Sequence, residues 1–419
     1  MNDKKILIVG NNIKDIALAK YLSKTHTIFI TSFNKSTIDF ATCIDIREDN
    51  IPELLEFVLE NGIDMTIVTS KDAILSGITQ KFVNNGQNIF APSLEASQIT
   101  LDKCFAKKIL YKLKIPTPKF GIFEKSNMAI DYIKNNKIPF VIKNNDDNSA
   151  AIFTSTVTAK NIIETAPIEK DKKIIIEDYI YGVPFSFYAI TDGYKALPFG
   201  SSLTYKHALE GDGGQLTSGL GACSPNYHVT LEQEYFIMDN VIYPVLENLE
   251  KEGNPYTGIL GVNGILSDDK TIQILGFNLF MQDCDISAIL ECIDEDLYSL
   301  FNSCIIGSFS DEVEHIKIND SYSSTIVLTN KNRINQENPI TGFDFLNEDS
   351  IINFYPNVTK NKYLEYEAKF GPVMQITTTG STLRSSIDKL YKEIDEITFQ
   401  GKTYRKDIGK PCSLQNLMF

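Results

Sequence analysis

Glycine and polar side chains are concentrated in one stretch of the chain, Tyr205–Pro225. It holds five glycines, at positions 211, 213, 214, 219 and 221, together with Lys206, Asp212 and Thr217. Glycine allows positive φ angles and lets the backbone approach a ligand closely, at an entropic cost in the unfolded chain. The stretch therefore fits a loop that approaches a ligand, although its composition also fits a flexible surface loop.

Two lysines upstream are placed where they could hold a polyphosphate. Lys103 opens a predicted helix over 101–113, and Lys143 ends the apolar run that begins at Phe140. A second apolar run, 173–177, leads into Glu177–Gly182, whose backbone could pair with a nucleotide base. Each of these charged residues could equally be a solvated residue at the end of its strand or helix.

A third group of candidates follows the predicted strand 271–277. Asn278 ends that strand, and Asp283 and Asp285 come shortly after it. Magnesium bound to ATP takes oxygen ligands, often one or two carboxylates together with the phosphates. The two aspartates would also suit the start of a helix, where a negative charge is favoured by the helix dipole.

The elements that must position these residues begin with a regular alternation over residues 1–100. Short β-rich runs at 5–9, 27–31, 65–68 and 88–90 are separated by helical patterns, which predicts a doubly wound parallel sheet. Ligands of such sheets lie beyond the carboxyl ends of the strands, where Gly10 and Asn11 follow the first run. The GxGxxG pattern is absent, so a nicotinamide cofactor is not expected.

The rest of the chain mixes helices and strands. Residues 119–190 read as a small α+β unit, 230–251 as a long helix and 258–277 as a hairpin. We predict three domains: an N-terminal domain over 1–100, a central region over 101–320 that contains the small lobe of about 119–190, and a C-terminal α+β domain over 321–419.

Composition limits the function classes. The chain has 419 residues and a formal net charge of −14, which argues against a nucleic-acid partner. No apolar run approaches the ~18 residues of a membrane span, and the N-terminus leads straight into a strand pattern. Seven scattered cysteines without CxxC spacing indicate reduced thiols. We expect a cytoplasmic protein, either a monomer or a homodimer.

The order of these short motifs resembles the phosphoribosylamine–glycine ligase family of ATP-grasp enzymes over nearly the whole chain. The matching segments are Ile6–Asn11, Lys103–Lys107, Ile115–Thr117, Val141–Lys143, Ile176–Gly182, Lys206, Gly211–Gly214, Thr217–Pro225, Tyr256–Gly258, Phe277–Asn278 and Arg405–Gly409. The resemblance implies an N-terminal doubly wound domain, a central ATP-grasp pair and a C-terminal α+β domain. It also implies that ATP phosphorylates glycine and that 5-phosphoribosylamine attacks the acyl phosphate.

The resemblance further implies roles for particular residues of this chain. Nucleotide contacts are expected from Lys103, Lys143, Glu177, Asp178 and Ile180; substrate contacts from Gly10, Asn11, Lys206, Gly214 and Gly219; catalytic roles from Asp212 and Thr217; and magnesium ligands from Asn278 and Asp283, with Asp285 as an alternative to Asp283.

The chain departs from the family pattern at several working positions. Gly276 stands where the family has a metal-binding glutamate, and Phe280 where it has an arginine. The glycine-rich flap over ATP is replaced by Asn144–Ala151, in which Asp146 and Asp147 would repel a triphosphate. Further departures are Asn11–Ile16, Thr69–Lys71, Val183–Pro184 and Thr204–Tyr205.

Three functions therefore remain open from the sequence. The chain is a divergent ligase of purine synthesis that uses ATP and magnesium, or a non-catalytic binding or scaffolding protein with the same fold, or an ATP-grasp ligase with different substrates. The retained glycine-rich stretch favours the first, because a chain with no substrate would have little physical need for it.

Overall fold

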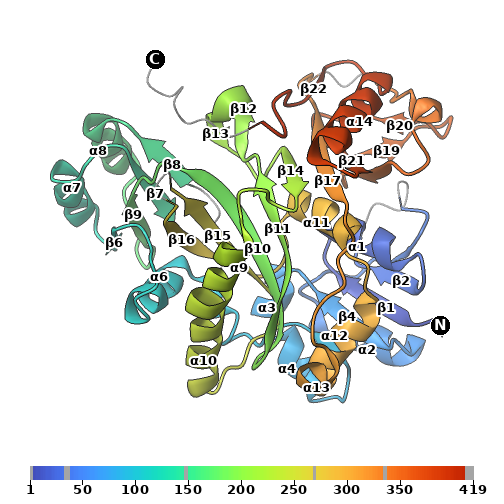
Figure 1. The fold of residues 1–419 in the computed structure, drawn as a ribbon, viewed down its shortest axis with the longest axis horizontal. Coiled ribbons are helices and arrows are strands. Elements are labelled where there is room, and N and C mark those ends of the chain that lie inside the picture. The colour runs from blue at the N-terminus through green and yellow to red at the C-terminus, as the bar shows by residue number, and fades with distance from the viewer. Residues whose placement is uncertain (1–2, 33–37, 146–149, 268–269, 334–336, 411–419) are drawn as a thin grey trace.

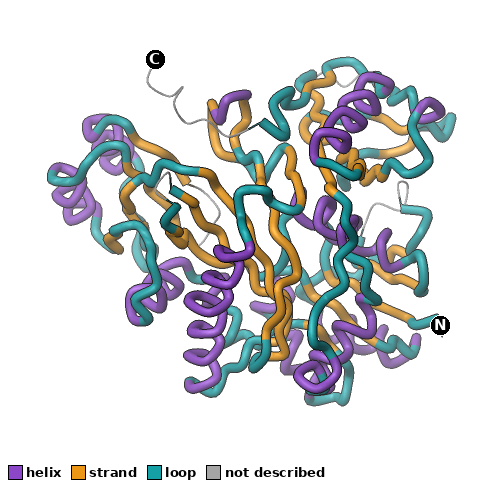
Figure 2. The backbone as a smooth tube through the Cα atoms, in the orientation of Figure 1, coloured by secondary structure: helices purple, strands orange, loops and turns teal. Residues whose placement is uncertain are grey.

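The computed structural model describes residues 3–32, 38–145, 150–267, 270–333 and 337–410 (Figure 1). Within these ranges, no helix combines the length and the apolar character needed to cross a membrane. The chain forms an N-terminal α/β unit, a small antiparallel lobe, and a long central sheet that continues into the C-terminal part (Figure 2).

The N-terminal unit is a parallel sheet in the order β3-β2-β1-β4-β5. Its strands are β1 (Lys5–Val9), β2 (Thr27–Ile30), β3 (Thr42–Cys43), β4 (Met65–Val68) and β5 (Ile89–Phe90). The helices between them are α1 (Ile13–Leu22), α2 (Ile51–Asn61), α3 (Lys71–Leu75) and α4 (Ile78–Val83). The predicted doubly wound sheet is confirmed, and β3 is an additional short edge strand that the sequence pattern did not reveal.

The small lobe is an antiparallel sheet in the order β6-β9-β7-β8. It contains β6 (Phe120–Phe123), β7 (Phe140–Asn144), β8 (Ala150–Phe153) and β9 (Ile174–Asp178), with helices α7 (Ser126–Lys134) and α8 (Thr156–Thr165). The short helix α5 (Gln98–Leu101) and α6 (Lys103–Lys112) lead into it, and Asp102 caps α6 by accepting from the Phe105 amide. The cap places Lys103 in the first turn of the helix.

The central sheet runs in the order β16-β15-β10-β11-β14-β17-β21-β18, and β22 pairs with β17. Its strands are β10 (Val183–Asp192), β11 (Ala196–Thr204), β14 (Gly221–Ser224), β15 (Thr257–Leu266), β16 (Ile272–Asn278), β17 (Tyr322–Asn330), β18 (Ile351–Phe354), β21 (Gly371–Gly380) and β22 (Lys402–Thr403). The hairpin β15–β16 was predicted and is present.

Helices cover this sheet on its faces. The predicted helix over 230–251 is present as α9 (Leu231–Ile237), a π-helical turn η2 (Met238–Ile242) and α10 (Tyr243–Lys251), which pack on β10 and β15. At the other end, α14 (Leu383–Glu396) packs on β21 and β17 through an apolar core. The short strands β19 (Thr359–Lys360) and β20 (Tyr366–Glu367) lie at the C-terminal edge.

The C-terminal part shares its sheet with the centre of the molecule. Strand β17 pairs with β14 on one side and with β21 on the other. The sheet therefore continues across the predicted boundary at 320/321. The three-domain division stays a prediction from the sequence.

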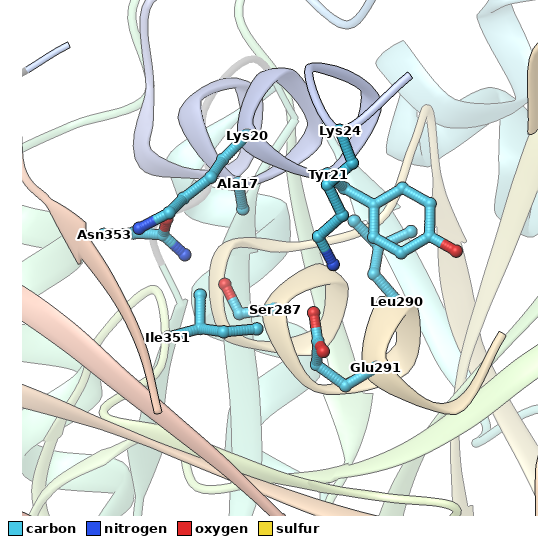
Figure 3. A pocket seen from close by; sticks show the side chains of 9 residues that line it. All are labelled: Ala17, Lys20, Tyr21, Lys24, Ser287, Leu290, Glu291, Ile351 and Asn353. Atoms are coloured by element: carbon cyan, nitrogen blue, oxygen red, sulfur yellow. The ribbon is translucent and has the colours of Figure 1, made fainter. Parts of the chain in front are cut away.

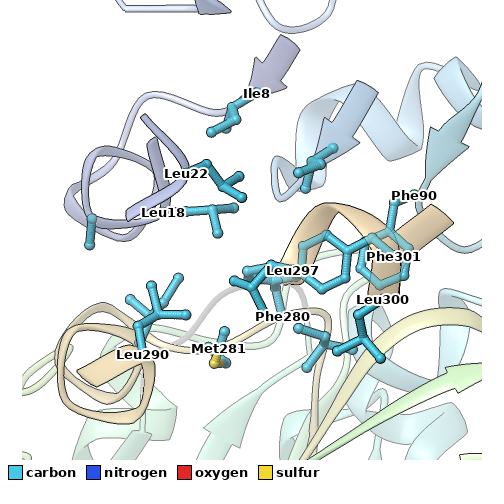
Figure 4. Packing of buried hydrophobic residues seen from close by; sticks show 14 of the residues in the cluster. Ile8, Leu18, Leu22, Phe90, Phe280, Met281, Leu290, Leu297, Leu300 and Phe301 are labelled. Atoms are coloured by element: carbon cyan, nitrogen blue, oxygen red, sulfur yellow. The ribbon is translucent and has the colours of Figure 1, made fainter. Parts of the chain in front are cut away.

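One apolar core joins the N-terminal sheet to the segment 280–316. Residues of β1 and α1, such as Ile8 and Leu18, pack with Phe280, Met281 and the helix α12 (Leu297–Ile306) (Figure 4). The rings of Phe90 and Phe301 stack with centroids 4.2 Å apart. This core fixes α11 (Asp283–Ile289) against the N-terminal unit, and α11 carries two of the predicted site residues.

Phe301 provides a test of this joint. The change Phe301→Ala should lower the free energy of unfolding by about 3–5 kcal/mol, because it leaves a cavity between the two units. Phe345→Ala, at a side chain that is 73% exposed, should change it by less than about 0.5 kcal/mol. Urea unfolding followed by circular dichroism measures both, and equal losses would contradict the proposed importance of the core.

Candidate functional site

A buried ion-pair cluster lies between the small lobe and α6. Glu177, at the end of β9, pairs through Oε2 with Lys107 Nζ at 2.8 Å and through Oε1 with Lys143 of β7. Burial alone would raise the pKa of Glu177, but Lys143 and Lys107 outweigh it and hold the pKa below its ordinary value. Lys107 Nζ also donates to Thr117 Oγ1 at 2.7 Å. The three charged residues of the cluster therefore come from β9, α6 and β7, which meet only in the folded chain.

The other predicted nucleotide residues surround this cluster. Lys103 Nζ donates to the Asn144 carbonyl at 3.1 Å, so it lies at the same end of β7 as Lys143. The Oδ1 atom of Asp178 is buried and has no hydrogen-bond partner within the described residues. Ile180 is half-buried in the connection to β10, in which a side chain at Gly182 would collide with the Leu266 carbonyl. Asp146 and Asp147 lie outside the described residues.

A second charged centre lies at the start of α11. Asp285 is fully buried, and its two carboxylate oxygens accept from Tyr188 Oη at 2.6 Å and Thr204 Oγ1 at 2.7 Å. Burial lowers the pKa of Lys206, the charge of Asp285 opposes this, and Lys143 adds to the lowering. Lys206 therefore lies within electrostatic range of Asp285 and of Lys143.

The end of β16 carries amides where a metal ligand was predicted. Asn278 Oδ1 accepts from Asn263 Nδ2 at 2.9 Å and from Gln282 Nε2 at 3.0 Å. Its Nδ2 is buried and has no partner among the described residues. Magnesium prefers oxygen ligands, whereas the unpartnered atom of Asn278 is the amide nitrogen Nδ2, a hydrogen-bond donor. Within the described ranges, no group of three or more His, Cys, Asp or Glu side chains could hold a metal ion. The residues at the end of β16 therefore do not fit magnesium.

The loop after β1 is held by Asp15 of α1. The Asp15 carboxylate is fully buried, accepts from the Asn12 amide at 2.8 Å and is bonded by Thr69 Oγ1. A side chain at Gly10 would come within 2.4 Å of that carboxylate. The neighbouring Asn11 Oδ1 is buried and unpartnered among the described residues. The loop thus presents an unused acceptor beside a tightly packed carboxylate.

Asp283 faces this loop. Burial raises the pKa of Asp283 to about 6, Lys14 opposes the rise, and Asp15 and Asp285 add to it. Lys14 Nζ donates to the Thr69 carbonyl at 3.1 Å. Asp283 is therefore within electrostatic range of Lys14 and Asp15 of the N-terminal unit and of Asp285. Asn278, the other predicted magnesium ligand, is instead hydrogen-bonded to Asn263 and Gln282.

The glycine-rich stretch forms a small hairpin and a turn. The hairpin comprises β12 (His207–Leu209), a 3₁₀ turn η1 (Glu210–Asp212) and β13 (Gly213–Leu216). Thr217 is bonded to the Lys206 carbonyl through both its amide (2.7 Å) and Oγ1 (2.8 Å). Gly219 has a φ of 118°, and its carbonyl accepts from Cys284 Sγ at 3.5 Å. Gly214 is exposed at the hairpin. Thr217 thus fixes the backbone that carries Lys206.

The C-terminal segment fastens this hairpin. Arg405 is 2% exposed and contacts Asp212 Oδ1 through both terminal nitrogens at 3.2 Å. It also pairs with Asp407, whose Oδ2 accepts from the Gly211 amide at 2.8 Å. Tyr205 Oη accepts from the Gly409 amide at 2.8 Å. The side chain of Asp212 is therefore engaged within the protein, at a backbone φ of 57°.

Several residues that shape the site were not among the predicted ones: Lys107, Asp15, Tyr188, Asn263 and Arg405. Lys107 and Arg405 lie in segments that carry the family resemblance, so their motifs were a usable signal. Tyr188 and Asn263 sit within apolar strands, and no local pattern distinguishes them. Their roles arise from the pairing of β10 and β15.

A separate hollow of about 40 Å³ lies between α1, the end of α11 with the 3₁₀ turn η3 (Leu290–Cys292), and β18 (Figure 3). Its lining includes Lys20, Tyr21 and Glu291, and Lys20 Nζ donates to the Ile352 carbonyl at 2.7 Å. The hollow has room for water but not for a nucleotide. The predicted site residues do not line it.

The buried lysine of the first cluster should make stability depend on pH. Burial lowers the pKa of Lys107 to about 8. The negative charge of Glu177 opposes this decrease, and the positive charge of Lys143 adds to it. Since the unfolded chain keeps its proton to about pH 10.4, the free energy of unfolding should rise between pH 8 and 10 by up to about 1.4 kcal/mol per pH unit. This contribution should disappear in Lys107→Met and persist in Lys108→Met, at the exposed neighbouring lysine. Identical slopes in both variants, measured by urea unfolding, would contradict it.

Arg405 should control the order of the hairpin. Arg405→Met leaves two carboxylates without their cation, a loss of about 3–5 kcal/mol for a buried pair. We expect amides 211–216 to exchange with solvent at least ten times faster, with Arg405→Lys intermediate because lysine lacks the planar fork. Arg384→Met, at a side chain that is 91% exposed, is the control. Unchanged exchange in Arg405→Met, measured by mass spectrometry, would show that the hairpin does not need this contact.

The chain was compared with known proteins. Residues 4–100 match the family model described as the phosphoribosylglycinamide synthetase N domain, and residues 101–286 match the ATP-grasp (A) domain of the same synthetase. The phosphoribosylamine–glycine ligase of Clostridium acetobutylicum is 29% identical over 420 residues, covering 97% of this chain and 99% of that protein. That of Caldanaerobacter subterraneus is 28% identical, with the same coverage.

Solved structures agree on the fold. The phosphoribosylamine–glycine ligase of Thermotoga maritima superposes with a TM-score of 0.79 at 21% identity, over 96% of this chain and 99% of that one. The biotin carboxylase domain of the Hydrogenobacter thermophilus 2-oxoglutarate carboxylase gives 0.70 at 14% identity, over 96% and 91%. The predicted ATP-grasp architecture is confirmed. With adjoining matches to both domain models over 4–286, and relatives aligned along nearly its whole length, the chain belongs to the phosphoribosylglycinamide synthetase family.

Proposed function

We propose that this chain is an ATP-dependent ligase that joins glycine to 5-phosphoribosylamine in purine biosynthesis. Family membership supports this, together with the activity named for the relatives in Clostridium and Caldanaerobacter. The observation that carries it to these residues is the buried ion-pair cluster in which Glu177 of β9 contacts Lys107 of α6 and Lys143 of β7. Lys206 interacts electrostatically with Lys143 of the small lobe and with Asp285 of α11.

The nucleotide belongs on the side of the small lobe. We assign the phosphates to Lys103 and Lys143, and the base to the backbone of the connection Glu177, Asp178 and Ile180. Clustered lysines suit a polyphosphate because they neutralise its charge at close range. Glu177 orients Lys143 through their ion pair, in which both side chains are largely buried. The ATP-grasp fold in general implies the use of ATP and a divalent cation.

The acceptor substrate belongs on the side of the N-terminal sheet. We assign its polar groups to Gly10 and Asn11, at the carboxyl end of β1, where ligands of such sheets bind. Lys206, Gly214 of the hairpin and Gly219 of the turn after it would close over the reacting groups. Asp212 and Thr217, predicted as catalytic residues, would act by holding that turn through the contacts of Asp212 with Arg405 and of Thr217 with the Lys206 carbonyl.

The reaction that the family resemblance implies has two steps. A carboxylate oxygen of glycine attacks the γ-phosphorus of ATP, the bond to the bridging oxygen breaks, and ADP leaves. The amine of 5-phosphoribosylamine then attacks the acyl carbon, phosphate leaves with the bonding electron pair, and the amine loses a proton. Lys206 and Lys143 would neutralise charge on the transferred group, and positioning supplies most of the acceleration.

Glycine-dependent ATP cleavage tests the proposal. Purified protein given ATP, glycine and 5-phosphoribosylamine should form ADP and glycinamide ribonucleotide, measured by chromatography. Lys143→Met should reduce kcat/KM by about 10²–10³-fold, because it removes a cation at the phosphates. Lys317→Met, at a side chain that is 66% exposed, should leave it unchanged.

Growth of a purine-auxotrophic strain that lacks this ligase gives an independent measurement. The protein should restore growth, and its Lys143→Met variant should not. ADP formation that needs neither glycine nor the amine, together with failure to restore growth, would overturn the proposal. A scaffolding protein would give no turnover, and a ligase with other substrates would turn over only with a different acid or amine. A cytoplasmic location, and a monomer or homodimer as the working form, remain predictions.

A further inference from the structure

The end of β16 offers hydrogen-bond donors in the place where the family resemblance puts a metal. Gly276 has no side chain, and a Cβ atom built there would meet no atom within 4 Å. Two residues later, the buried Nδ2 of Asn278 lacks a partner among the described residues. An open space with an unused amide donor at its edge suits an anionic oxygen atom of a ligand.

The direction of the surrounding hydrogen bonds fixes this donor. Asp285 is a carboxylate, which only accepts, so Thr204 Oγ1 must donate to it. The shorter contact of Ser186 Oγ then runs to Asn263 Oδ1, at 3.1 Å against 3.4 Å to Thr204. Asn263 is thereby oriented with Nδ2 toward Asn278 Oδ1. The Ser186 hydroxyl thus orients the Asn263 amide, while the Thr204 hydroxyl donates its own proton to Asp285.

A second route reaches the same oxygen. Tyr188 Oη donates to Asp285 and accepts from the Gln282 backbone amide at 3.3 Å, which positions the backbone that carries the Gln282 side chain. Gln282 Nε2 also donates to Asn278 Oδ1. With two amide donors on it, Oδ1 is used within the protein, and the group left for a ligand is Nδ2.

The lysines Lys206 and Lys143 also favour an anionic ligand over a metal ion. Lys206 interacts electrostatically with Asp285, the residue to which Tyr188 and Thr204 donate, and with Lys143. Asp285 has a hydroxyl donor on each of its two carboxylate oxygens. Lysine ammonium and amide N–H groups bind phosphoryl oxygens directly, whereas magnesium would need an oxygen ligand that this end of β16 does not present.

We propose that a nucleoside triphosphate is held here directly by Asn278 Nδ2, Lys206 and Lys143, without a protein-bound divalent cation as bridge. The inference rests on the proposed function, since it concerns the same nucleotide. It adds that lysine and amide donors in this chain replace the metal clamp. Binding of the nucleotide should therefore be independent of magnesium.

Calorimetric titration of the full chain with ATP tests this. The dissociation constant measured in excess EDTA should lie within about threefold of that measured in millimolar magnesium chloride, a difference under about 0.7 kcal/mol. In Asn278→Asp, one carboxylate oxygen can still accept from Asn263 and Gln282, while the other oxygen replaces the donor Nδ2. Free ATP should then bind at least tenfold more weakly, and magnesium should restore the affinity.

Asn240→Asp, the same change at an exposed helix position, should behave as the unsubstituted protein does. If the unsubstituted protein loses ten times or more of its affinity in EDTA, the inference is overturned while the ligase proposal stands. If ATP does not bind under either condition, both are overturned. If Asn278→Asp folds, by circular dichroism, and shows no dependence on magnesium, the role of Asn278 is overturned. The EDTA comparison on the unsubstituted protein decides the case if that variant does not fold.

Discussion

The buried carboxylate of Asp285 is the constraint on which the centre of the molecule depends. A charge removed from water is costly unless hydrogen bonds and a counter-charge surround it. Here the hydrogen bonds come from Tyr188 of β10 and Thr204 at the end of β11, and Lys206 just beyond it interacts with Asp285 electrostatically. The helix that carries Asp285 is packed against the N-terminal sheet, so satisfying one carboxylate requires three parts of the chain to meet.

Glu177 plays a similar part in the small lobe, with the opposite balance of charge. One carboxylate is paired with two lysines, so the cluster carries a net positive charge toward the end of β7. The cluster thus serves as a structural ion pair and as a ligand site, because one glutamate cannot neutralise both lysines and one positive charge is left for a ligand. A chain with a net charge of −14 can in this way keep a local positive region for a phosphorylated ligand.

The local pattern of apolar and polar residues was enough to predict most of the fold. The alternation of runs over residues 1–100 predicted the parallel sheet, and the spacing around residues 267–270 predicted the β15–β16 hairpin. The site was less accessible, because its contacts are distant in sequence. Asp283 and Asp285 both precede a helix core, and nothing local shows that Asp285 turns inward while Asp283 faces the N-terminal loop. Nor could composition tell that Asp212 would be paired with Arg405 rather than open to a ligand.

The contact between Asp212 and Arg405 joins residues 193 positions apart, and this separation has a consequence for biosynthesis. Translation proceeds from the N-terminus, and domains generally fold in the order in which they emerge. The parallel sheet and the small lobe can therefore assemble while the ribosome is still at work. The glycine-rich hairpin cannot be fastened until Arg405 has been synthesised, so a product terminated before Arg405 would lack this contact of the hairpin.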